Sequence, residues 1–329
     1  FVASTSSRLL GRCITPCTPP CASTTSQACR SRHVAQVWRS RDTLGALVCW
    51  PAVVEAASAV LRLFRACHQR YWPCGMSSED TVSVTVGVLA LQGAFHEHIS
   101  RFSSLNASAK GFHVRPITVR RPDQLAQCHA LVIPGGESTA IALGLRNAGL
   151  TEPVRDWIRQ GRPVWGTCAG MILLASIATG GKRGGQELLG GMDVQVGRNG
   201  FGSQVYSFEC DLLCPAIGDK LFPGVFIRAP VVERLLKDAA VDDALHVPQG
   251  VMVSYCTPDM RGSNPHPVEP IAWLPASEPH DASDSKNAAS HVVALRQGHL
   301  FATSFHPELT TDTRLHSYFV REIVIPSRS

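Results

Sequence analysis

A nearly continuous apolar run, Val82 to Leu91, constrains the fold of this chain more than any other feature of its sequence. Its length and its β-branched residues are typical of a strand that is buried on both faces of a parallel sheet. After this run, strand patterns at 114–119, 130–133 and 163–166 alternate with helix patterns at 94–105, 137–148, 151–160 and 171–177. The alternation predicts an α/β domain in which helices cover both faces of a mostly parallel central sheet.

Beyond Gly180 the sequence changes to Gly-rich turns and short strands, and the central sheet resumes near the end of the chain. The elements predicted there are strands at 205–213, 225–227, 251–255, 292–295 and 300–304 and a helix from about 311. Residues 258–290 carry six prolines and a polar run. They are therefore predicted to form a flexible surface insertion.

The formal net charge of +5 is spread unevenly along the chain. Residues 1–75 contain nine Arg and no Lys, and only Asp42 and Glu55 oppose them, which leaves a net charge of +7. The other 254 residues hold 22 basic and 24 acidic side chains and are slightly acidic. The charge therefore does not argue for a nucleic-acid partner, because the predicted α/β part has no basic aromatic surface motif.

Residues 1–80 are predicted to be a disordered N-terminal extension of a domain at 81–329. They hold seven of the twelve cysteines, and Met76 is the first methionine. These features fit translated upstream sequence, or an Arg-rich and Ser/Thr-rich transit peptide, and a folded domain stays open. Pro51, Glu55 and Arg62 interrupt the apolar stretch at 46–63, so no membrane span is predicted, and the cysteine spacings predict no metal site. A cytoplasmic location is expected, with organellar targeting by residues 1–75 as the alternative.

The pentapeptide Gly166–Gly170 places Cys168 between a predicted strand and a predicted helix, with a glycine two positions away on either side. This pattern is typical of a nucleophile elbow, a turn too tight for larger side chains. The start of a helix favours the thiolate. The Ala169 amide can stabilise the oxyanion that forms when sulfur attacks a carbonyl, by roughly 3 kcal/mol. A buried core cysteine is the alternative for Cys168.

His306 and Glu308 follow the predicted strand at 300–304 and are the candidates for a base and its orienting acid. Residues two apart in an extended chain face the same side. Glu308 can therefore bond one imidazole nitrogen of His306 while the other nitrogen meets Cys168. The three residues predict a Cys-His-Glu triad, and a solvated loop histidine is the alternative.

Gly135 and Gly136 follow the predicted strand at 130–133 and are expected at the same sheet edge as the elbow. Ligands of open α/β sheets bind beyond the carboxyl ends of the strands. These two glycines are therefore candidates, with Ala169, for an oxyanion hole. Glu137 and Ser138 start the next helix and are candidates to hold polar substrate atoms. A simple glycine turn is the alternative.

The Gly-x-Cys-x-Gly elbow with a distant His-Pro-Glu resembles the class I glutamine amidotransferases, which implies a three-layer, flavodoxin-like fold. Within that group, several stretches spread in order across residues 83–322 resemble the glutaminase subunits of pyridoxal phosphate synthases. They are LALQGAF at 89–95, IPGGEST at 133–139, GRNGFG at 197–202, FIRAP at 226–230 and SFHPELT at 304–310. The segment from about 260 to 290 is longer than the corresponding connection in that family.

The resemblance implies that this chain hydrolyses L-glutamine to glutamate and ammonia. Cys168 would attack the side-chain amide, and water would hydrolyse the glutamyl thioester with His306 as the proton carrier and Glu308 as its orienter. The residues implied to bind glutamine are Gly136, Glu137, Ser138, Arg198, Ile227 and Arg228. An Arg guanidinium suits the α-carboxylate through a bidentate pair.

A partner is implied as well, a TIM-barrel synthase subunit that receives the ammonia through a channel in a large hetero-oligomer and makes pyridoxal 5'-phosphate (vitamin B6). Gln92 is implied to couple the glutaminase site to this subunit. The chain itself is expected to need no cofactor. The alternatives are another class I amidotransferase, a hydrolase of γ-glutamyl substrates, or a non-catalytic assembly subunit.

Overall fold

The computed structural model describes residues 81–109, 111–181, 185–198, 207–236, 251–275 and 291–328. The chain divides into two units, 1–72 and 73–329, and every described residue belongs to the second unit. The predicted disorder of residues 1–80 therefore lies outside the described part of the chain.

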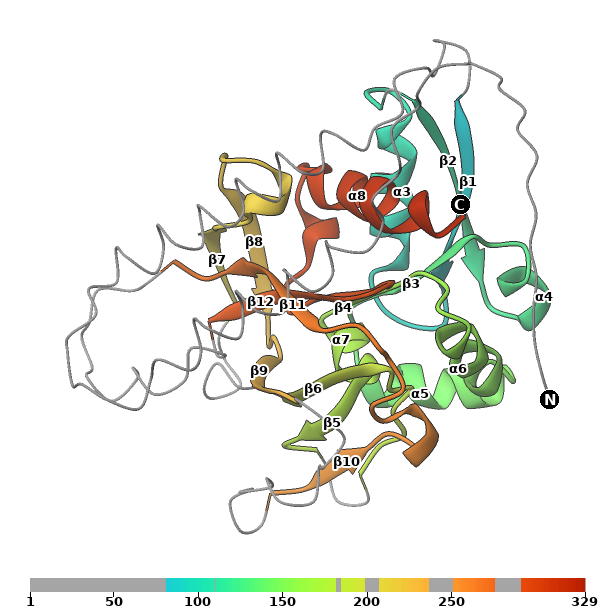
Figure 1. Ribbon diagram of the computed structural model, residues 1–329, viewed down its shortest axis with the longest axis vertical. Coiled ribbons are helices and arrows are strands. Elements are labelled where there is room, and N and C mark those ends of the chain that lie inside the picture. Colours follow the sequence, from blue (N-terminus) through green and yellow to red (C-terminus); the bar gives the residue numbers. More distant parts are fainter. Residues whose placement is uncertain are drawn as a thin grey trace, which may run out of the picture. The chain divides into compact units, whose positions relative to one another are not determined.

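A seven-stranded sheet forms the centre of this unit, with the strand order β11-β12-β13-β4-β3-β1-β2 (Figure 1). The strands from β13 to β2 run parallel, and β12 and β11 are added antiparallel at one edge. The chain steps from β1 to β2 in one direction and then to β3 and β4 in the other, so the switch point of the sheet lies between β1 and β3. The strands are β1 (Val82–Leu89), β2 (Phe112–Val119), β3 (Ala130–Ile133), β4 (Val164–Thr167), β11 (Val268–Trp273), β12 (Val292–Gln297) and β13 (Leu300–Thr303).

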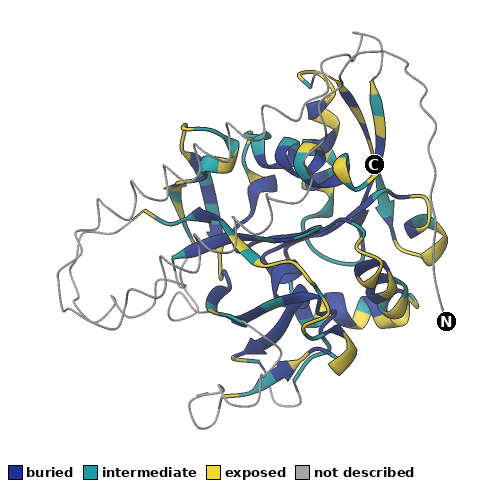
Figure 2. Cartoon of the chain, in the orientation of Figure 1, coloured by how far each residue is buried: buried dark blue, intermediate teal, exposed yellow. Residues whose placement is uncertain are grey.

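Alternate side chains of the central strands supply two separate apolar layers. Leu131 and Ile133 pack on the face covered by α5, α6 and α7, whereas Ala130 and Val132 pack on the face covered by α3 and α8. Figure 2 shows the central strands as buried over most of their length. The predicted α/β fold, with helices on both faces of a mostly parallel sheet, is confirmed. The helices are α3 (Phe95–Leu105), α5 (Ser138–Asn147), α6 (Thr151–Arg159), α7 (Ala169–Leu174) and α8 (Arg314–Tyr318), which continues as a π-helix (Phe319–Val324).

Two smaller sheets flank the central one. A four-stranded sheet, β10-β5-β6-β9, extends the apolar layer of α5 to α7, and a two-stranded hairpin of β7 and β8 packs with the layer of α3 and α8. These strands are β5 (Ala175–Thr179), β6 (Met192–Gly197), β7 (Ser207–Leu212), β8 (Phe222–Ile227), β9 (Val231–Leu235) and β10 (Val253–Tyr255). The remaining turns are a short helix α4 (Pro122–Leu125) and 3-10 helices at Pro215–Ile217, Pro258–Met260, Pro307–Leu309 and Pro326–Arg328. In the part of the chain that the structure describes, no helix has the length and apolar character needed to cross a membrane.

The helix predicted at 171–177 is wrong in its second half. The helix α7 begins earlier, at Ala169, and ends at Leu174, and the chain then continues directly as the strand β5. Ala175 already has extended backbone angles, and the Ser176 carbonyl accepts a bond from the Cys256 amide of the neighbouring segment. Pairing with β6 and β10 therefore makes this segment a strand. A short apolar run fits either a helix or a strand, and its periodicity alone does not distinguish them.

The prediction of a flexible insertion over 258–290 is also wrong in its first half, and residues 276–290 lie outside the described part. Residues 268–273 form β11, which pairs with β12 and adds an edge strand to the central sheet. Pro270 sits in this strand beside a register shift. A proline is tolerated there because one side of an edge strand pairs with no other strand, and because a residue at a bulge does not have to donate a hydrogen bond to the neighbouring strand. Proline content alone therefore predicts a loop where an edge strand forms.

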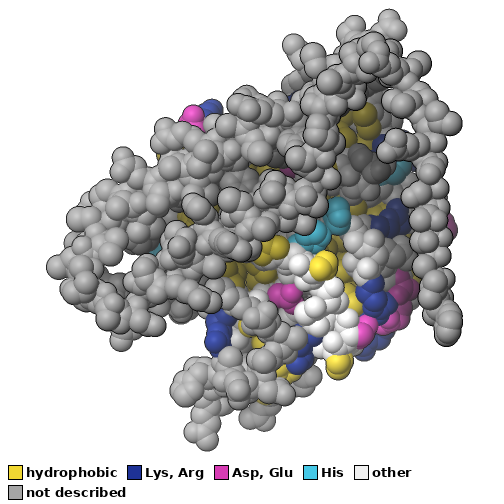
Figure 3. All heavy atoms as spheres, viewed as in Figure 1, with side chains coloured by type: hydrophobic (Ala, Val, Ile, Leu, Met, Phe, Trp, Pro, Cys, Tyr) yellow, Lys and Arg dark blue, Asp and Glu magenta, His cyan; other side chains and the backbone are white. Residues whose placement is uncertain are grey.

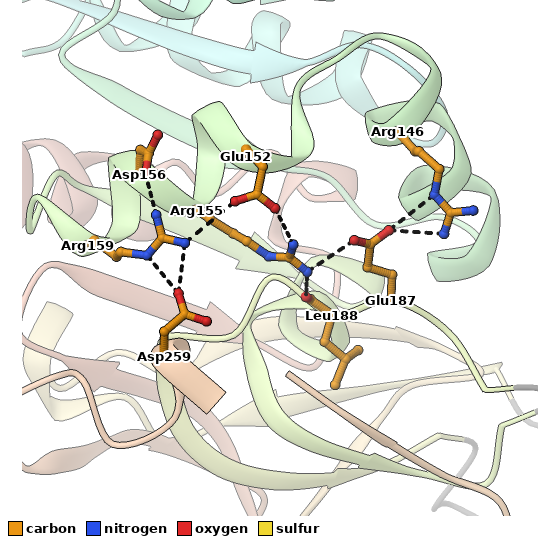
Figure 4. A network of polar contacts seen from close by, with 8 residues as sticks. All are labelled: Arg146, Glu152, Arg155, Asp156, Arg159, Glu187, Leu188 and Asp259. Atoms are coloured by element: carbon orange, nitrogen blue, oxygen red, sulfur yellow. Dashed lines mark hydrogen bonds and ion pairs between the residues drawn. The ribbon is translucent and has the colours of Figure 1, made fainter. Parts of the chain in front are cut away.

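An ion-pair network fixes α6 to the segments that precede β6 and follow β10. On the face shown in Figure 3, acidic and basic side chains gather over α6, and Figure 4 shows how they pair. The Arg155 guanidinium bonds Glu152 at 2.5 Å, Glu187 at 3.2 Å and the Leu188 carbonyl at 2.8 Å. Arg155 is only 5% exposed, so its head group is the buried centre of this network.

Candidate active site

Four parallel strands end at one edge of the central sheet, and predicted site residues follow each of them. Gln92 follows β1, Gly135 follows β3, Cys168 follows β4 and His306 follows β13. The last residues of β4 and β13 pair with each other, and the Cys168 amide donates to the Thr303 carbonyl at 2.8 Å. The sheet therefore brings these four positions, which are far apart in the sequence, to its carboxyl edge, where open α/β sheets bind ligands.

Cys168 lies in a strained turn between β4 and α7. Its φ angle is 47°, in the left-handed region that disfavours residues with a side chain, and its side chain is buried. Gly166 and Gly170 make the turn sterically feasible, because a Cβ on Gly166 would lie 2.5 Å from the Gly170 carbonyl carbon and one on Gly170 would collide with the Ile133 carbonyl. Strain of this kind, about 1–3 kcal/mol, is typical of functional sites. The local geometry is that of the predicted nucleophile elbow.

His306 and Glu308 form a buried hydrogen-bonded pair at this elbow. The His306 Nδ1 lies 2.8 Å from the Glu308 Oε1, and the Glu308 side chain is fully buried. Burial lowers the pKa of His306, but hydrogen bonds to Cys168 and Glu308 outweigh it and raise that pKa to about 10. Burial raises the pKa of Glu308, but the nearby His98 imidazole and the bond to His306 outweigh it and lower that pKa. The contacts therefore favour a protonated imidazole between the Cys168 sulfur and an ionised carboxylate.

The glycine turn after β3 packs directly against this pair. A Cβ on Gly135 would collide with the His306 Cε1 and would lie 3.3 Å from the Cys168 Cβ. The Gln92 Oε1 accepts the Glu137 amide at 2.9 Å and thereby holds the end of the turn. The structure thus brings Gly135, Gly136 and Gln92 to the elbow. The roles of Gly135, Gly136 and Ala169 in an oxyanion hole stay a prediction, as does the coupling role of Gln92.

Three of the predicted glutamine-binding residues cluster beside the start of α5. The Arg198 guanidinium lies 3.3 Å from one Glu137 oxygen, while the other oxygen accepts the Ala140 amide at 2.7 Å and caps the helix. The Ser138 side chain is buried, and its hydroxyl donates to the Gln186 Oε1 at 2.9 Å. The cluster therefore combines a guanidinium, a carboxylate and a hydroxyl at the start of α5.

Of the other three predicted glutamine-binding residues, Gly136 lies in the turn after β3, and Ile227 and Arg228 lie at the end of β8. The Ile227 carbonyl is 3.9 Å from the Cys168 Sγ, and the His306 amide donates to the Val225 carbonyl at 2.8 Å. Arg228 has a φ of 46°, and Cys168 and Arg228 are the two described residues other than glycine with a positive φ. Both strained positions therefore belong to one site, and the exposed Arg228 side chain lies at its rim.

Sequence reasoning missed two residues that contact the triad or the glutamine-binding cluster, His98 and Gln186, and a third, His316, that is hydrogen-bonded to His98. His98 and His316 are fully buried behind Glu308, and Gln186 accepts the Ser138 hydroxyl. His98 lies in the apolar stripe of α3 with Phe95, Phe102 and Leu105. A histidine at a position that the helix period assigns to the core is a signal that could have identified it.

The described part of the chain offers chemistry for acyl transfer rather than for metal binding. Among the residues that the structure describes, no group of three or more His, Cys, Asp or Glu side chains is arranged to hold a metal ion. A thiol at a strained elbow, an oriented imidazole and a buried carboxylate are instead the groups that activate a nucleophile toward a carbonyl carbon. The site can therefore form and hydrolyse a thioester.

Comparison with protein families gives one match that covers most of the described domain. The model of the SNO glutamine amidotransferase family matches residues 88–268 and 275–325. A solved structure described as a glutamine amidotransferase is 38% identical, with a TM-score of 0.52, and the match covers 73% of this chain and 98% of that one.

Curated relatives match the same part of the chain. The probable pyridoxal 5'-phosphate synthase subunit PDX2 of Arabidopsis thaliana is 42% identical over 243 residues, which are 72% of this chain and 85% of the relative. The pyridoxal 5'-phosphate synthase subunit PdxT of Herpetosiphon aurantiacus is 41% identical over 237 residues, which are 72% of this chain and 99% of the relative. The described domain therefore matches these relatives over nearly their whole length.

Proposed function

This chain belongs to the SNO glutamine amidotransferase family, and from that premise we propose that it is the glutaminase subunit of a pyridoxal 5'-phosphate synthase, with Cys168, His306 and Glu308 as its catalytic triad. The observation that carries the proposal is the strained Cys168 at the carboxyl edge of the sheet, next to a His306 that is hydrogen-bonded to a buried Glu308. The chain is an enzyme that hydrolyses glutamine and supplies ammonia for vitamin B6 synthesis.

The first half of the reaction forms a thioester. The Cys168 nucleophile is the thiolate, whose proton is held by His306. It attacks the side-chain amide carbon of glutamine, and the carbonyl oxygen becomes an oxyanion that the amides of Gly136 and Ala169 stabilise. The His306 imidazolium then donates its proton to the departing nitrogen, and ammonia leaves as the carbonyl re-forms. Because the Glu308 carboxylate is hydrogen-bonded to Nδ1 of His306, Nε2 is the nitrogen that exchanges protons with the reacting atoms.

The second half regenerates the enzyme. The neutral His306 takes a proton from a water molecule, and the resulting hydroxide attacks the thioester carbon. The tetrahedral intermediate collapses to glutamate and releases the Cys168 thiolate, while His306 has regained its proton. One glutamine and one water therefore give one glutamate and one ammonia.

Substrate recognition is assigned to the cluster beside α5. Arg198 binds the α-carboxylate of glutamine, because a guanidinium pairs with a carboxylate through two parallel hydrogen bonds. Glu137 already contacts Arg198 at 3.3 Å and offers an acceptor to the substrate α-ammonium group. Ser138, Ile227 and Arg228 line the path to the sulfur. This assignment explains a preference for an amino acid over a simple amide.

The ammonia is proposed to pass to a TIM-barrel synthase subunit within a large hetero-oligomer. Gln92 couples the two subunits, because its side chain holds the Glu137 amide at the end of the turn that carries Gly135. A partner that reorients Gln92 would change the position of that turn. A cytoplasmic location stays a prediction from the sequence.

The test is a steady-state assay of glutamate formation by the full chain, with and without the synthase subunit. We expect the synthase to accelerate glutamine hydrolysis, and we expect Cys168→Ala to abolish it in both cases. Glutamine hydrolysis that the synthase leaves unchanged would favour another amidotransferase, and preferred cleavage of γ-glutamyl peptides would favour a γ-glutamyl hydrolase. Full ammonia release by Cys168→Ala would refute the triad and leave a non-catalytic assembly role.

A further inference from the structure

Two buried histidines lie behind Glu308. The His98 Nε2 is hydrogen-bonded to the Thr167 Oγ1 at 3.2 Å and lies 3.3 Å from the Glu308 Oε2, within ion-pair distance. No described residue makes a hydrogen bond to this buried oxygen, so His98 is the polar side chain that faces it. The His98 Nδ1 lies 3.2 Å from the His316 Nε2. His98 comes from α3 and His316 from α8, and both side chains are 0% exposed. The triad is therefore backed by groups from two helices of one layer.

Both histidines are neutral under ordinary conditions. Burial lowers the pKa of His98 to about 3, although the charge of Glu308 acts in the opposite direction. Burial and the charge of Arg101 lower the pKa of His316 to about 3 as well. Each ring therefore carries a single N–H, and its place on the ring decides which hydrogen bonds form.

The contacts favour one arrangement of these protons. A lone pair on the His98 Nε2 would face the negative Glu308 Oε2 at 3.3 Å, so Nε2 carries the proton, which serves the Thr167 Oγ1 and faces this carboxylate oxygen. The His98 Nδ1 is then an acceptor, and the His316 Nε2 must donate to it. The His316 Nδ1 is left with a lone pair, and it is buried without a partner among the described residues. The N–H groups thus point in one direction, from His316 to His98 and from His98 toward Thr167 and Glu308.

The two oxygens of the Glu308 carboxylate consequently face two different imidazoles. His306 approaches Oε1 from the same loop, at 2.8 Å, and His98 approaches Oε2 from α3, at 3.3 Å. The other titratable and charged groups on this side are Arg101, whose Nε donates to the Glu308 main-chain carbonyl at 3.3 Å, and His316 on α8. Cys168 faces the far side of His306.

We propose that His98 is a positioning residue of the glutaminase, which fixes the Glu308 carboxylate through Oε2 so that Oε1 stays aligned with His306, and that His316 fixes the tautomer of His98. The proposal rests on the proposed triad. His98 touches no reacting atom, so it acts through Glu308 on the orientation and charge of the imidazole. Removing its donor makes the buried carboxylate easier to protonate and freer to rotate.

The test compares three variants of the full chain in the presence of the synthase subunit. His98→Leu removes both ring nitrogens, and His98→Gln keeps an N–H group that can reach the place of Nε2. His96→Asn is the matched control, because His96 is an exposed histidine of the same helix. For each protein, kcat and KM for glutamine are measured, and the alkylation rate of Cys168 by iodoacetamide is followed from pH 4 to 9 by mass spectrometry.

We expect His98→Leu to lower kcat by about 10- to 100-fold, the effect of losing one polar contact to a buried charged group, with KM unchanged. The pH below which alkylation of Cys168 slows should rise by about one unit, because Glu308 becomes protonated at a higher pH when His98 no longer faces it. His98→Gln should restore most of both properties, and His96→Asn should match the unmodified protein. The proposal would be overturned, in favour of a packing role, if His98→Leu and His98→Gln lowered kcat equally. It would also be overturned if His98→Leu slowed the alkylation of Cys168 by the same factor at every pH.

The alkylation profile separates this proposal from the proposed function. If glutamine is not the substrate, no variant shows glutaminase activity, yet the profile of Cys168 still reports the support of Glu308. Should His98→Leu fail to fold, nitrogen NMR of labelled histidines in the unmodified chain decides. Neutral Nε2–H tautomers for both His98 and His316 near neutral pH support the proposal, and a charged ring or an Nδ1–H tautomer at His98 contradicts it.

Discussion

Replacing Gly135 by Ala tests whether the close approach of the β3 turn to His306 is needed for activity. Gly135 does not have a positive φ, so its backbone accepts an alanine. The added Cβ would collide with the His306 Cε1, and it would lie 2.7 Å from Nδ1 and 3.3 Å from the Cys168 Cβ. The perturbation is therefore a single methyl group placed against the imidazole of the triad.

The imidazole must withdraw by about 1 Å to restore an ordinary carbon contact of about 3.5 Å. This withdrawal strains or breaks the bond from Nδ1 to the Glu308 Oε1, which is 2.8 Å long. A displacement of about 1 Å at a reacting group lowers the rate roughly 100-fold. Losing one charge-assisted hydrogen bond costs about 1.5–3 kcal/mol, which corresponds to a rate loss of the same order. Overpacking lowers the free energy of unfolding by about 1–3 kcal/mol.

The assay is glutamate release at saturating glutamine in the presence of the synthase subunit. Gly144→Ala is the control, because Gly144 also has no positive φ and its added Cβ would meet only the Leu91 side chain, at 3.1 Å. We expect a kcat about 100-fold lower for Gly135→Ala, with a thermal midpoint lower by roughly 2–10 °C, and nearly unchanged values for Gly144→Ala. A folded Gly135→Ala protein with the full kcat would refute the proposed fit between this turn and the triad.

Three further outcomes are expected. Arg155→Met should lower the free energy of unfolding in urea by about 2–3 kcal/mol, because Arg155 is the buried centre of its ion-pair network. Arg159→Met removes an exposed ion pair and should lower it by less than about 1 kcal/mol. Equal losses for the two variants would contradict this reasoning. Arg198→Lys should raise KM for glutamine about tenfold with little change in kcat, since it replaces a bidentate fork by a point charge, and an unchanged KM in steady-state kinetics would exclude the carboxylate role. Burial lowers the pKa of His98 and of His316 to about 3 in the folded chain, below the value of 6.5 in the unfolded chain. Between pH 6.5 and pH 3 the unfolded chain therefore binds more protons than the folded chain, and the free energy of unfolding falls as the pH falls. The slope should reach at most about 1.4 kcal/mol per pH unit for each histidine, and His98→Gln with His316→Gln should flatten the curve measured by urea unfolding.

The central strands could be predicted because they are buried on both faces and leave uninterrupted apolar runs. The strand at 130–133 has the predicted bounds, and the run from Val82 ends two residues early, at Leu89. The strands β6 (MDVQVG), β9 (VVERL) and β11 (VEPIAW) were not predicted, because charged residues and, in β11, a proline interrupt their apolar patterns. Their existence depends on tertiary contacts that no local pattern contains.

The triad could be predicted because tight turns and strand ends leave local signatures. Gly166, Cys168 and Gly170 are constrained by close backbone approach, and His306 and Glu308 are two residues apart. The support behind the triad could not be predicted in this way, because it joins a helix near the start of the domain to one at its end. Only the packing of α3 against α8 on one face of the sheet brings His98 and His316 together behind Glu308.

The most direct test of the account is to label the chain with a glutamine analogue that carries a diazoketone in place of the side-chain amide. The reagent alkylates the nucleophile that attacks glutamine, and peptide mass spectrometry identifies the modified residue among the twelve cysteines. We expect one adduct per chain, at Cys168, formed in step with the loss of glutaminase activity and absent from Cys168→Ala. An adduct on any other cysteine, or loss of activity without modification of Cys168, would contradict the proposed mechanism.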